Sequence, residues 1–259
     1  MLNSLAIAIL FLLPFERIPS LDVLGVTLRL SVLVLLVFLM IEIPRLWRRQ
    51  RLWPFSAMDW AIVAYVGACV ISIPGSVASR HGMVTLGFLG VVMLGYVLMS
   101  RAWDKPIAYK TVAKPVLWAG AITAVFGLYQ FWGDALGLPA SATGLLERYT
   151  KIVFNFPRIQ SVGLEPLYYA NYLLFPLFLL IVPLVTQPEK GRLRQLILLI
   201  LFATVFILTL SRGAFLAFAG GSLVVLILRW KELNWPNVGR VLIGLVISVA
   251  VAMASISLV

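Results

Sequence analysis

Long apolar runs alternate with short polar connections along this chain of 259 residues. Each run is continuously apolar rather than alternating, which is typical of membrane-spanning helices and not of barrel strands. The lengths lie near the ~20 residues that a helix needs to cross a bilayer, with the shorter runs at the low end of the range. The sequence therefore predicts nine transmembrane helices, near residues 2–15, 23–44, 56–73, 83–100, 115–133, 166–186, 196–210, 214–228 and 241–259.

No linker, repeat or low-complexity tract separates these runs. The sequence therefore predicts one all-α transmembrane domain, a polytopic helical bundle that covers residues 1–259. The first run is short and could also belong to a signal peptide. It has no basic segment before it, and no small-x-small cleavage site precedes Pro14. We therefore interpret it as the first, short transmembrane helix.

The longest connection runs from residue 134 to residue 165 and is too apolar for a disordered loop. An apolar segment between two spans gains free energy by lying in the membrane surface. We therefore expect part of this connection to form a short interfacial helix. Its large apolar residues are Leu138, Leu145, Leu146, Tyr149, Ile152, Phe154 and Phe156.

The composition agrees with a membrane protein. Hydrophobic residues make up 62% of the chain, charged residues make up 12%, and the mean hydropathy is +1.02. A soluble domain carries roughly twice this charged fraction. The net charge of +11 would fit a nucleic-acid-binding protein, but the charges occupy the short connections instead of forming one basic face. The expected partner is therefore the lipid bilayer and not a nucleic acid.

The distribution of Lys and Arg predicts the orientation of the helices, because cytoplasmic connections carry an excess of these residues. With the N-terminus inside and the C-terminus outside, most of them fall on the cytoplasmic side, so the nine-span count and the orientation support each other. Arg29 alone is expected within a span, about two turns inside the second helix. The expected inner side holds Arg45, Arg48, Arg49, Arg51, Arg101, Lys105, Lys110, Lys114, Lys190, Arg192, Arg194, Arg229, Lys231 and Arg240, and the outer side holds Arg17, Arg80, Arg148, Lys151, Arg158 and Arg212.

Two short segments place an arginine at the expected outer face. Arg158 lies near the end of the long connection, and Arg212 lies in a tight turn between the seventh and eighth expected helices. A guanidinium group stays charged at any pH and binds phosphate through two parallel hydrogen bonds. Two such groups could bind the diphosphate of a polyprenyl-linked substrate and stabilise the charge on the departing diphosphate. The residues expected to support this site are Ser161, Glu165, Asn171 and Ser211.

Some of these residues also have a simpler interpretation. Arg212 could anchor a helix end in the lipid headgroups, although the turn around it leaves almost no loop in which to reach them. Glu165 directly precedes Pro166, and a carboxylate before a first-turn proline is typical of a helix N-terminus. A carboxylate beside Arg158 would also orient that arginine.

Other catalytic candidates are weak. His81, the only histidine, lies at the outer start of the fourth expected helix and is a candidate general base, but a lone interfacial histidine usually has no catalytic role. One histidine, one cysteine (Cys69) and scattered carboxylates cannot supply a dedicated metal site. No phosphate-binding glycine loop or nucleophile elbow is present. We therefore expect no metal and no cofactor.

The segments around the two arginines resemble the O-antigen ligase and O-antigen polymerase superfamily, which also contains bacterial protein O-oligosaccharyltransferases. The resemblance extends over essentially the whole chain, but its motifs are short and do not distinguish the members. They are Arg158-x-x-Ser161-x-x-x-Glu165-Pro166-x-x-x-Ala170, Leu208-Thr209-Leu210-Ser211-Arg212-Gly213-Ala214 and the early segment 14–19.

The resemblance implies a metal-independent, inverting glycosyltransferase in the bacterial inner membrane, with its active face in the periplasm. The donor would be a glycan on undecaprenyl diphosphate, as in the biosynthesis of lipopolysaccharide and related polysaccharides. The acceptor would be a hydroxyl group of a lipid-linked or saccharide molecule. Arginines at the positions of Arg158 and Arg212 would bind the diphosphate.

Members of this superfamily usually continue into a large periplasmic loop with a catalytic histidine, followed by further helices. This chain stops at Val259, before such a loop, so the resemblance implies a truncated N-terminal portion or a partial relative and leaves the catalytic base unknown. Two other functions stay open. One is a secondary transporter of a small anion, although no inverted repeat is found. The other is a non-catalytic subunit of a membrane assembly.

Overall fold

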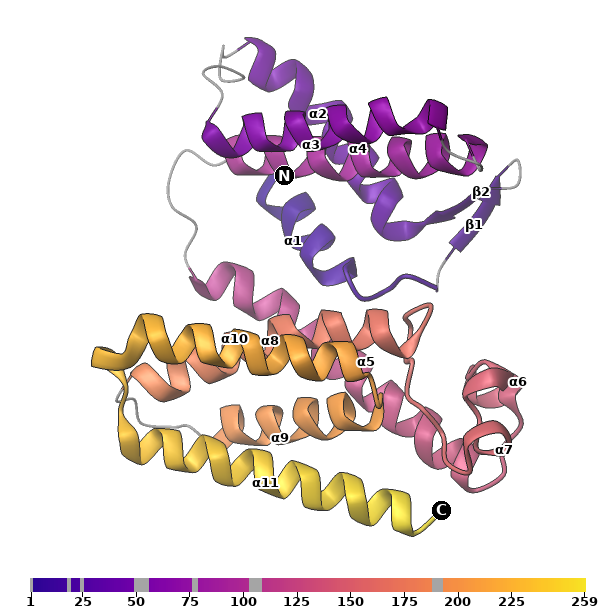
Figure 1. Cartoon of the computed structure of the whole chain (residues 1–259), viewed down its shortest axis with the longest axis vertical. Coiled ribbons are helices and arrows are strands. Elements are labelled where there is room, and N and C mark those ends of the chain that lie inside the picture. The colour runs from indigo at the N-terminus through magenta and orange to yellow at the C-terminus, as the bar shows by residue number, and fades with distance from the viewer. Residues whose placement is uncertain are drawn as a thin grey trace. The chain divides into compact units, whose positions relative to one another are not determined.

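The computed structural model describes residues 2–17, 20–23, 26–48, 56–75, 79–102, 109–187 and 193–259 (Figure 1). Almost all of its regular structure is helical, which confirms the predicted class. Nine longer helices in the described residues coincide with the nine apolar runs. They are α1 (Leu2–Leu12), α2 (Leu30–Arg48), α3 (Ala57–Ser72), α4 (Ser79–Ala102), α5 (Tyr109–Ala135), α8 (Pro166–Thr186), α9 (Leu193–Leu208), α10 (Arg212–Arg229) and α11 (Trp235–Ser257).

Six helical segments in the described part of the chain are long and apolar enough to cross a membrane. Two further apolar segments, within α4 and α9, are shorter, and α1 has 11 residues. These lengths fit a multi-pass membrane protein, and the count of nine spans stays a prediction. The six segments are Leu30–Arg48, Ala57–Gly75, Tyr109–Ala135, Pro166–Thr186, Arg212–Glu232 and Trp235–Ser257.

A short β-hairpin takes the place of the start of the second expected span. β1 (Ser20–Val23) pairs antiparallel with β2 (Val26–Arg29), so that Ser20 lies opposite Arg29. The prediction that Arg29 lies two turns inside a helix is therefore wrong, because the helix begins only after the second strand. The guanidinium group of Arg29 approaches the carboxylate of Glu16 at 3.9 Å.

The chain divides into two compact units, and the single membrane domain stays a prediction. Unit 1 comprises Met1–Ile9 and Ser31–Tyr109, and unit 2 comprises Leu10–Leu30 and Lys110–Val259. The apolar pattern of the sequence does not mark this division.

In unit 1, an ion pair joins the start of α3 to the end of α4. Ser56 and Asp59 form a capping box, in which the Asp59 N–H donates to Ser56 Oγ at 3.2 Å and the Ser56 N–H donates to Asp59 Oδ2 at 2.7 Å. The same Oδ2 accepts from Arg101 Nη2 at 2.6 Å, and both side chains are largely buried. The cap that begins α3 therefore also fastens it to α4, which lies alongside (Figure 1).

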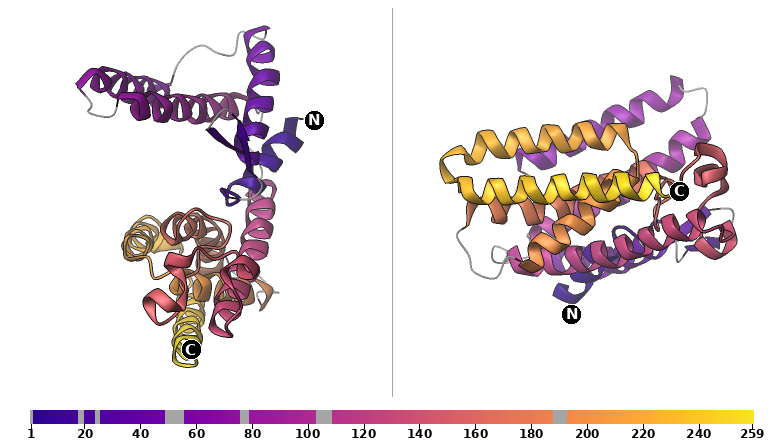
Figure 2. Two further views of the ribbon diagram at one scale, coloured as in Figure 1. Left: turned by 90° about the vertical axis from the view of Figure 1, so that its right-hand side faces the viewer. Right: turned by 90° about the horizontal axis from the view of Figure 1, so that it is seen from below.

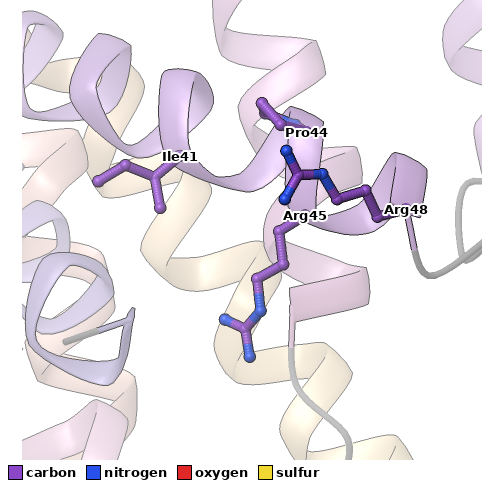
Figure 3. A pocket seen from close by; sticks show the side chains of 4 residues that line it. All are labelled: Ile41, Pro44, Arg45 and Arg48. Atoms are coloured by element: carbon purple, nitrogen blue, oxygen red, sulfur yellow. The ribbon is translucent and has the colours of Figure 1, made fainter.

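A basic pocket lies along α2, also in unit 1. It has a volume of about 310 Å³ and is lined by Ile41, Pro44, Arg45 and Arg48 (Figure 3). Pro44 removes a backbone hydrogen bond from the interior of the helix. Arg45 Nη1 lies 3.3 Å from Oε1 of the buried Glu42. The charge of Arg45 is therefore partly neutralised by a carboxylate of the same helix.

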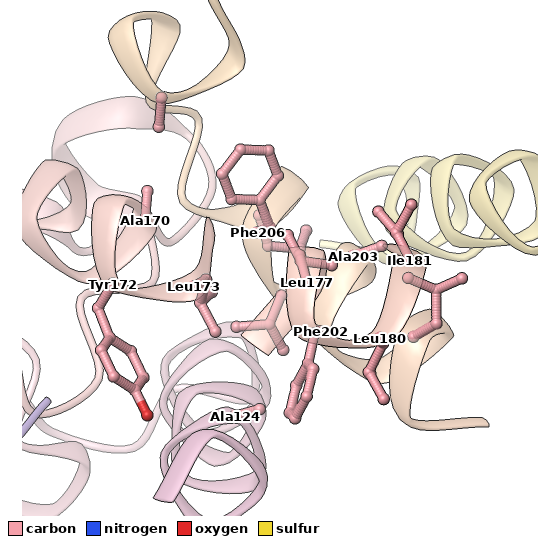
Figure 4. Close-up of a cluster of buried hydrophobic side chains, with 14 of the residues drawn as sticks. Ala124, Ala170, Tyr172, Leu173, Leu177, Leu180, Ile181, Phe202, Ala203 and Phe206 are labelled. Carbon is pink, nitrogen blue, oxygen red and sulfur yellow. The ribbon is translucent and has the colours of Figure 1, made fainter. Parts of the chain in front are cut away.

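Unit 2 is a bundle of α5, α8, α9, α10 and α11, in which consecutive helices run in opposite directions (Figures 1 and 2). α8 packs against α9, α10 and α11. Its residues Leu173 and Leu177 belong to one buried cluster with Phe202 and Phe206 of α9 and Ala124 of α5 (Figure 4). Lipid tails are as apolar as leucine, so these contacts stabilise the bundle through close packing.

Small residues on α10 let this helix approach α8 closely, as the spacing of Gly213, Ala217 and Gly221 predicts. A Cβ atom added to Gly221 would lie 2.6 Å from Cζ of Phe178 in α8. One added to Gly213 would lie 3.7 Å from Cδ1 of Leu167. Two members of the small-residue stripe therefore face α8.

One end of unit 2, on the right in Figure 1, gathers the end of α5, the start of α8, the end of α9 and the start of α10. The connection between α5 and α8 lies there too. It forms α6 (Ala140–Thr143), the 3₁₀ turn η2 (Glu147–Tyr149) and α7 (Lys151–Phe154). Short helices thus replace the single interfacial helix that the sequence predicts, and their position at a membrane surface stays a prediction. This end of unit 2 holds the candidate site.

Candidate functional site

The turn between α9 and α10 has an unusual backbone. Leu210 has a φ of 52°, in the left-handed region that residues other than glycine enter at a cost of roughly 1–2 kcal/mol. The Leu210 N–H donates to the carbonyl of Ile207 at 2.9 Å, and α10 begins two residues later at Arg212. Carbonyl groups at the end of a helix have no helical donor, so those of Thr209 and Leu210 need one from elsewhere.

Arg158 supplies that donor. Its Nε and Nη2 each donate to the Thr209 carbonyl at 3.3 Å, and Nη2 also donates to the Leu210 carbonyl at 3.3 Å. The next residue, Ile159, donates its N–H to the Leu208 carbonyl at 3.2 Å. Arg158 therefore fastens the long connection to the C-terminal end of α9, where a positive charge is favourable.

Arg158 and Arg212, which lie far apart in the sequence, line one pocket of about 690 Å³. We call it the arginine pocket. Ser211 also lines the pocket, and most of the remaining side chains are apolar. A pocket with two cations and an apolar wall suits a ligand that carries both an anionic group and a hydrocarbon part. The other lining residues are Phe156, Leu167, Leu210, Gly213 and Phe215.

Arg212 is the more exposed of the two arginines. It is the first residue of α10, and its guanidinium group makes no hydrogen bond or ion pair within the described residues. The first N–H groups of a helix have no helical acceptor and form the positive end of the helix dipole. The N-cap residue Ser211 makes no capping bond with its side chain. The charge of Arg212 thus adds to the positive field of the helix end, which is the arrangement of an anion site.

Three of the four expected supporting residues, Ser161, Glu165 and Asn171, do not belong to the described lining of the arginine pocket. Ser161 is buried with a φ of 51°, and its hydroxyl group donates to the carbonyl of Thr123 at 2.7 Å. Asn171 is exposed on α8. Ser161 therefore contributes to the shape of the connection that carries Arg158, and a role for Asn171 in binding stays a prediction.

Gln130 of α5 holds the same connection in place, and the sequence analysis missed it. The fully buried amide of Gln130 donates to the Ser161 carbonyl at 3.1 Å and accepts from the Ser161 N–H at 2.7 Å. Irregular backbone at membrane depth must find its hydrogen-bond partners within the protein, and Gln130 is such a partner. The signal that could have found it is a polar amide inside an apolar run.

Glu165 pairs with Arg148, and an orienting contact of Glu165 with Arg158 stays a prediction. Arg148 Nη2 lies 3.5 Å from Glu165 Oε1, and both side chains are exposed. Glu165 is the N-cap of α8 and Pro166 follows at the first helical position, but the carboxylate makes no capping hydrogen bond. The guanidinium group of Arg158 is held by the turn carbonyls instead, so its orientation comes from the backbone.

A second pocket, of about 480 Å³, lies in the connection between α5 and α8, and we call it the loop pocket. Lys151 shapes its wall, because its N–H donates to Asp134 Oδ2 at 2.7 Å and its Nζ donates to the Ala135 carbonyl at 2.6 Å. The lining mixes both charge signs with apolar side chains. It comprises Asp134, Gly137, Leu138, Pro139, Ala140, Glu147, Arg148, Thr150, Lys151 and Ile152.

The candidate base cannot be related to these pockets, because the side chain of His81 lies outside the described residues. Among the described residues, no group of three or more His, Cys, Asp and Glu side chains could hold a metal ion. The described lining of the arginine pocket offers two arginines and an apolar wall.

No protein-family model, curated protein or solved structure matches this chain.

Proposed function

We propose that the arginine pocket binds the diphosphate of a polyprenyl-linked glycan, and that this chain is part of a membrane glycosyltransferase of the O-antigen ligase and polymerase type. The observation that carries the proposal is the lining of one pocket by Arg158 and Arg212. The site would lie on the periplasmic side of a bacterial inner membrane. The nine spans, with the N-terminus inside and the C-terminus outside, belong to the same proposal.

The chemistry of the pocket supports a lipid-linked diphosphate over a small inorganic anion. Arg212 and the N-terminal N–H groups of α10 offer donors and positive charge to phosphate oxygens. Phe156, Leu167 and Phe215 give the same pocket an apolar wall, which a polyprenyl chain would contact. A free anion would gain nothing from that wall.

The same groups would assist glycan transfer. When an acceptor hydroxyl attacks the anomeric carbon, the bond to the diphosphate breaks and negative charge grows on the departing oxygen. The two guanidinium groups would stabilise that charge more than they stabilise the ground state, which is the condition for lowering the barrier. The resemblance stated above implies that no metal ion is needed.

A binding experiment tests the proposal. The purified chain in nanodiscs of neutral lipid should bind undecaprenyl diphosphate, measured by native mass spectrometry or by displacement of a fluorescent analogue. Arg212→Ala should weaken binding by at least tenfold, because a hydrogen bond to a charged group contributes about 1.5–3 kcal/mol and tenfold corresponds to about 1.4 kcal/mol.

Arg229→Ala is the matched control. Arg229 lies at the opposite end of the same helix, is exposed and pairs with Glu232 at 2.6 Å. Its removal takes the same charge from the chain and should leave the affinity unchanged. Wild-type affinity in Arg212→Ala, or vesicles that take up labelled phosphate without binding the lipid diphosphate, would overturn the proposal. In cells, Arg212→Ala should abolish glycan transfer and leave membrane insertion intact.

A further inference from the structure

We propose that Arg148 is a third arginine of the anion site, shared between Glu165 and the diphosphate, and that Tyr149 positions it beside Arg158. This inference rests on the proposed function, because it names a further ligand-binding group at the same site. It comes from one buried aromatic ring, one exposed ion pair and the charge balance of the site.

Two guanidinium groups lie close to the ring of Tyr149. The Cζ atom of Arg148 lies 4.9 Å from the centre of its ring, and that of Arg158 lies 5.9 Å from the same centre. The ring is 9% exposed, and the Tyr149 carbonyl accepts from the Arg158 N–H at 2.9 Å. The two cations are therefore no farther apart than these two ring distances together. An aromatic face attracts a guanidinium group, so the buried ring holds both groups, Arg158 in the lining of the arginine pocket and Arg148 in the lining of the loop pocket.

Glu165 occupies Arg148 only weakly. Their ion pair is 3.5 Å long, and the two side chains are 59% and 41% exposed. Exposed ion pairs contribute little, because water and salt screen them. A phosphate group offers shorter, bidentate hydrogen bonds to the same guanidinium fork. Glu165 is two residues before Leu167, which lines the arginine pocket, and Arg148 would turn from Glu165 toward that pocket to exchange its partner.

The donors of Arg158 explain why a third arginine is useful. Its Nε and Nη2 donate to the carbonyls of Thr209 and Leu210, so part of its hydrogen-bonding capacity serves the turn. Arg148 has no such commitment to the backbone within the described residues. It therefore supplies donors that Arg158 does not have to spare.

The charges also balance. Arg148, Arg158 and Arg212 together with Glu165 carry a net charge of two positive units. A diphosphate esterified at both ends, as in a polyprenyl-linked glycan, carries one negative charge on each phosphate. The four side chains thus match the charge of that ligand. Without Arg148, the two pocket arginines and Glu165 would carry a net charge of only one positive unit.

The experiment compares three variants by the affinity for undecaprenyl diphosphate in neutral nanodiscs. Arg148→Ala should weaken binding about tenfold, from the loss of a charged hydrogen-bond donor. Glu165→Gln should tighten binding about threefold, because it removes the competitor for Arg148. The double variant should bind like Arg148→Ala, because Glu165 acts through Arg148. Glu165 makes no capping hydrogen bond, so these changes leave the start of α8 intact, and thermal unfolding checks this.

Two controls separate this mechanism from general electrostatics. Glu147→Gln removes a neighbouring exposed carboxylate from the same 3₁₀ turn and should leave the affinity within about twofold of wild type, since screening weakens exposed charges that are not in contact. Tyr149→Phe keeps the aromatic face and should bind like wild type, whereas Tyr149→Leu should lose affinity in the direction of Arg148→Ala.

The outcomes distinguish this inference from the proposed function. Weaker or unchanged binding in Glu165→Gln, or equal tightening in Glu147→Gln, would overturn the role of the Arg148–Glu165 pair. Full affinity in Arg148→Ala, together with loss of binding in Arg212→Ala, would overturn the inference and leave the proposed function standing. Full affinity in variants of Arg148, Arg158 and Arg212 alike would overturn both.

Discussion

The two arginines of the pocket have different structural duties. Arg158 donates three hydrogen bonds to the carbonyls of a turn that contains a left-handed leucine. Arg212 is exposed at the start of α10 and makes no such bond within the described residues. One residue therefore contributes to the fold and to the site, and the other contributes to the site alone. Stability measurements can separate these two contributions.

Arg158→Ala should lower the free energy of unfolding by about 1–3 kcal/mol, because it leaves buried carbonyl groups without a donor. Arg212→Ala should change it by no more than about 0.5 kcal/mol, as is usual for an exposed side chain. The thermal unfolding midpoint in detergent measures the difference. Equal destabilisation by the two substitutions would show that Arg158 does not hold the turn.

At the residue scale, the sequence was enough to single out Arg158 and Arg212, because a charge next to hydrocarbon is costly and needs a reason. It was not enough to find their neighbours. Arg158 binds backbone carbonyls 51 and 52 residues away, and no side-chain pattern encodes an acceptor on the backbone. The ion pair of Glu165 with Arg148 was not predicted either, because it depends on how the long connection folds. The hydrogen bonds between Gln130 and Ser161 were not predicted, because they form only when the long connection folds back onto α5.

At the scale of the elements, the apolar runs predicted the helices well, because continuous hydrophobicity at this length has few other solutions in a membrane. The hairpin was missed inside the run 23–44. Residues 20–29 alternate between apolar and polar side chains over most of their length, as a strand pair does, but the apolar helix that follows concealed the change of period. Arg29 marked the boundary and was interpreted as a charge within a span.

The approach of α10 to α8 can be tested with two adjacent glycines. Gly221→Ala would place a Cβ atom 2.6 Å from the ring of Phe178, and we expect a loss of about 1–3 kcal/mol of stability from overpacking. Gly220→Ala meets no atom within 4 Å and should gain about 0.5–1 kcal/mol from the better helix propensity of alanine. Thermal unfolding in detergent measures both. The same sign for the two substitutions would contradict close packing along this stripe.

At the scale of the whole molecule, the charge distribution predicts an alternating path through the membrane, and unit 2 alternates in direction as that path requires (Figure 1). The shortest of the five long helices in unit 2 is α9, with 16 residues. A helix of this length spans only about 24 Å, less than the ~30 Å of a typical hydrocarbon core. Whether it crosses decides the side on which every later connection lies.

Cysteine labelling in cells tests that point. In a Cys69→Ala background, Ile152→Cys and Lys231→Cys would introduce exposed thiols, because Ile152 is 88% exposed and Lys231 is exposed in the 3₁₀ turn η3 (Trp230–Glu232). Three helices separate the two positions. A maleimide that cannot cross membranes should therefore label position 152 in intact spheroplasts and position 231 only after permeabilisation. Labelling of both from the same side would show that one of these three helices does not cross, and α9 is the shortest of them.

The two hydrogen bonds between Gln130 and Ser161 also have a consequence for the insertion of the protein during synthesis. α5 is synthesised before the segment that carries Ser161, so the side-chain amide of Gln130 enters the bilayer before its hydrogen-bond partners exist. An unpaired amide in hydrocarbon is costly, which makes α5 a poor helix to release alone. We expect the insertion machinery to retain α5 until α8 follows it, so that the two helices leave as a pair. The order of assembly then depends on a single glutamine.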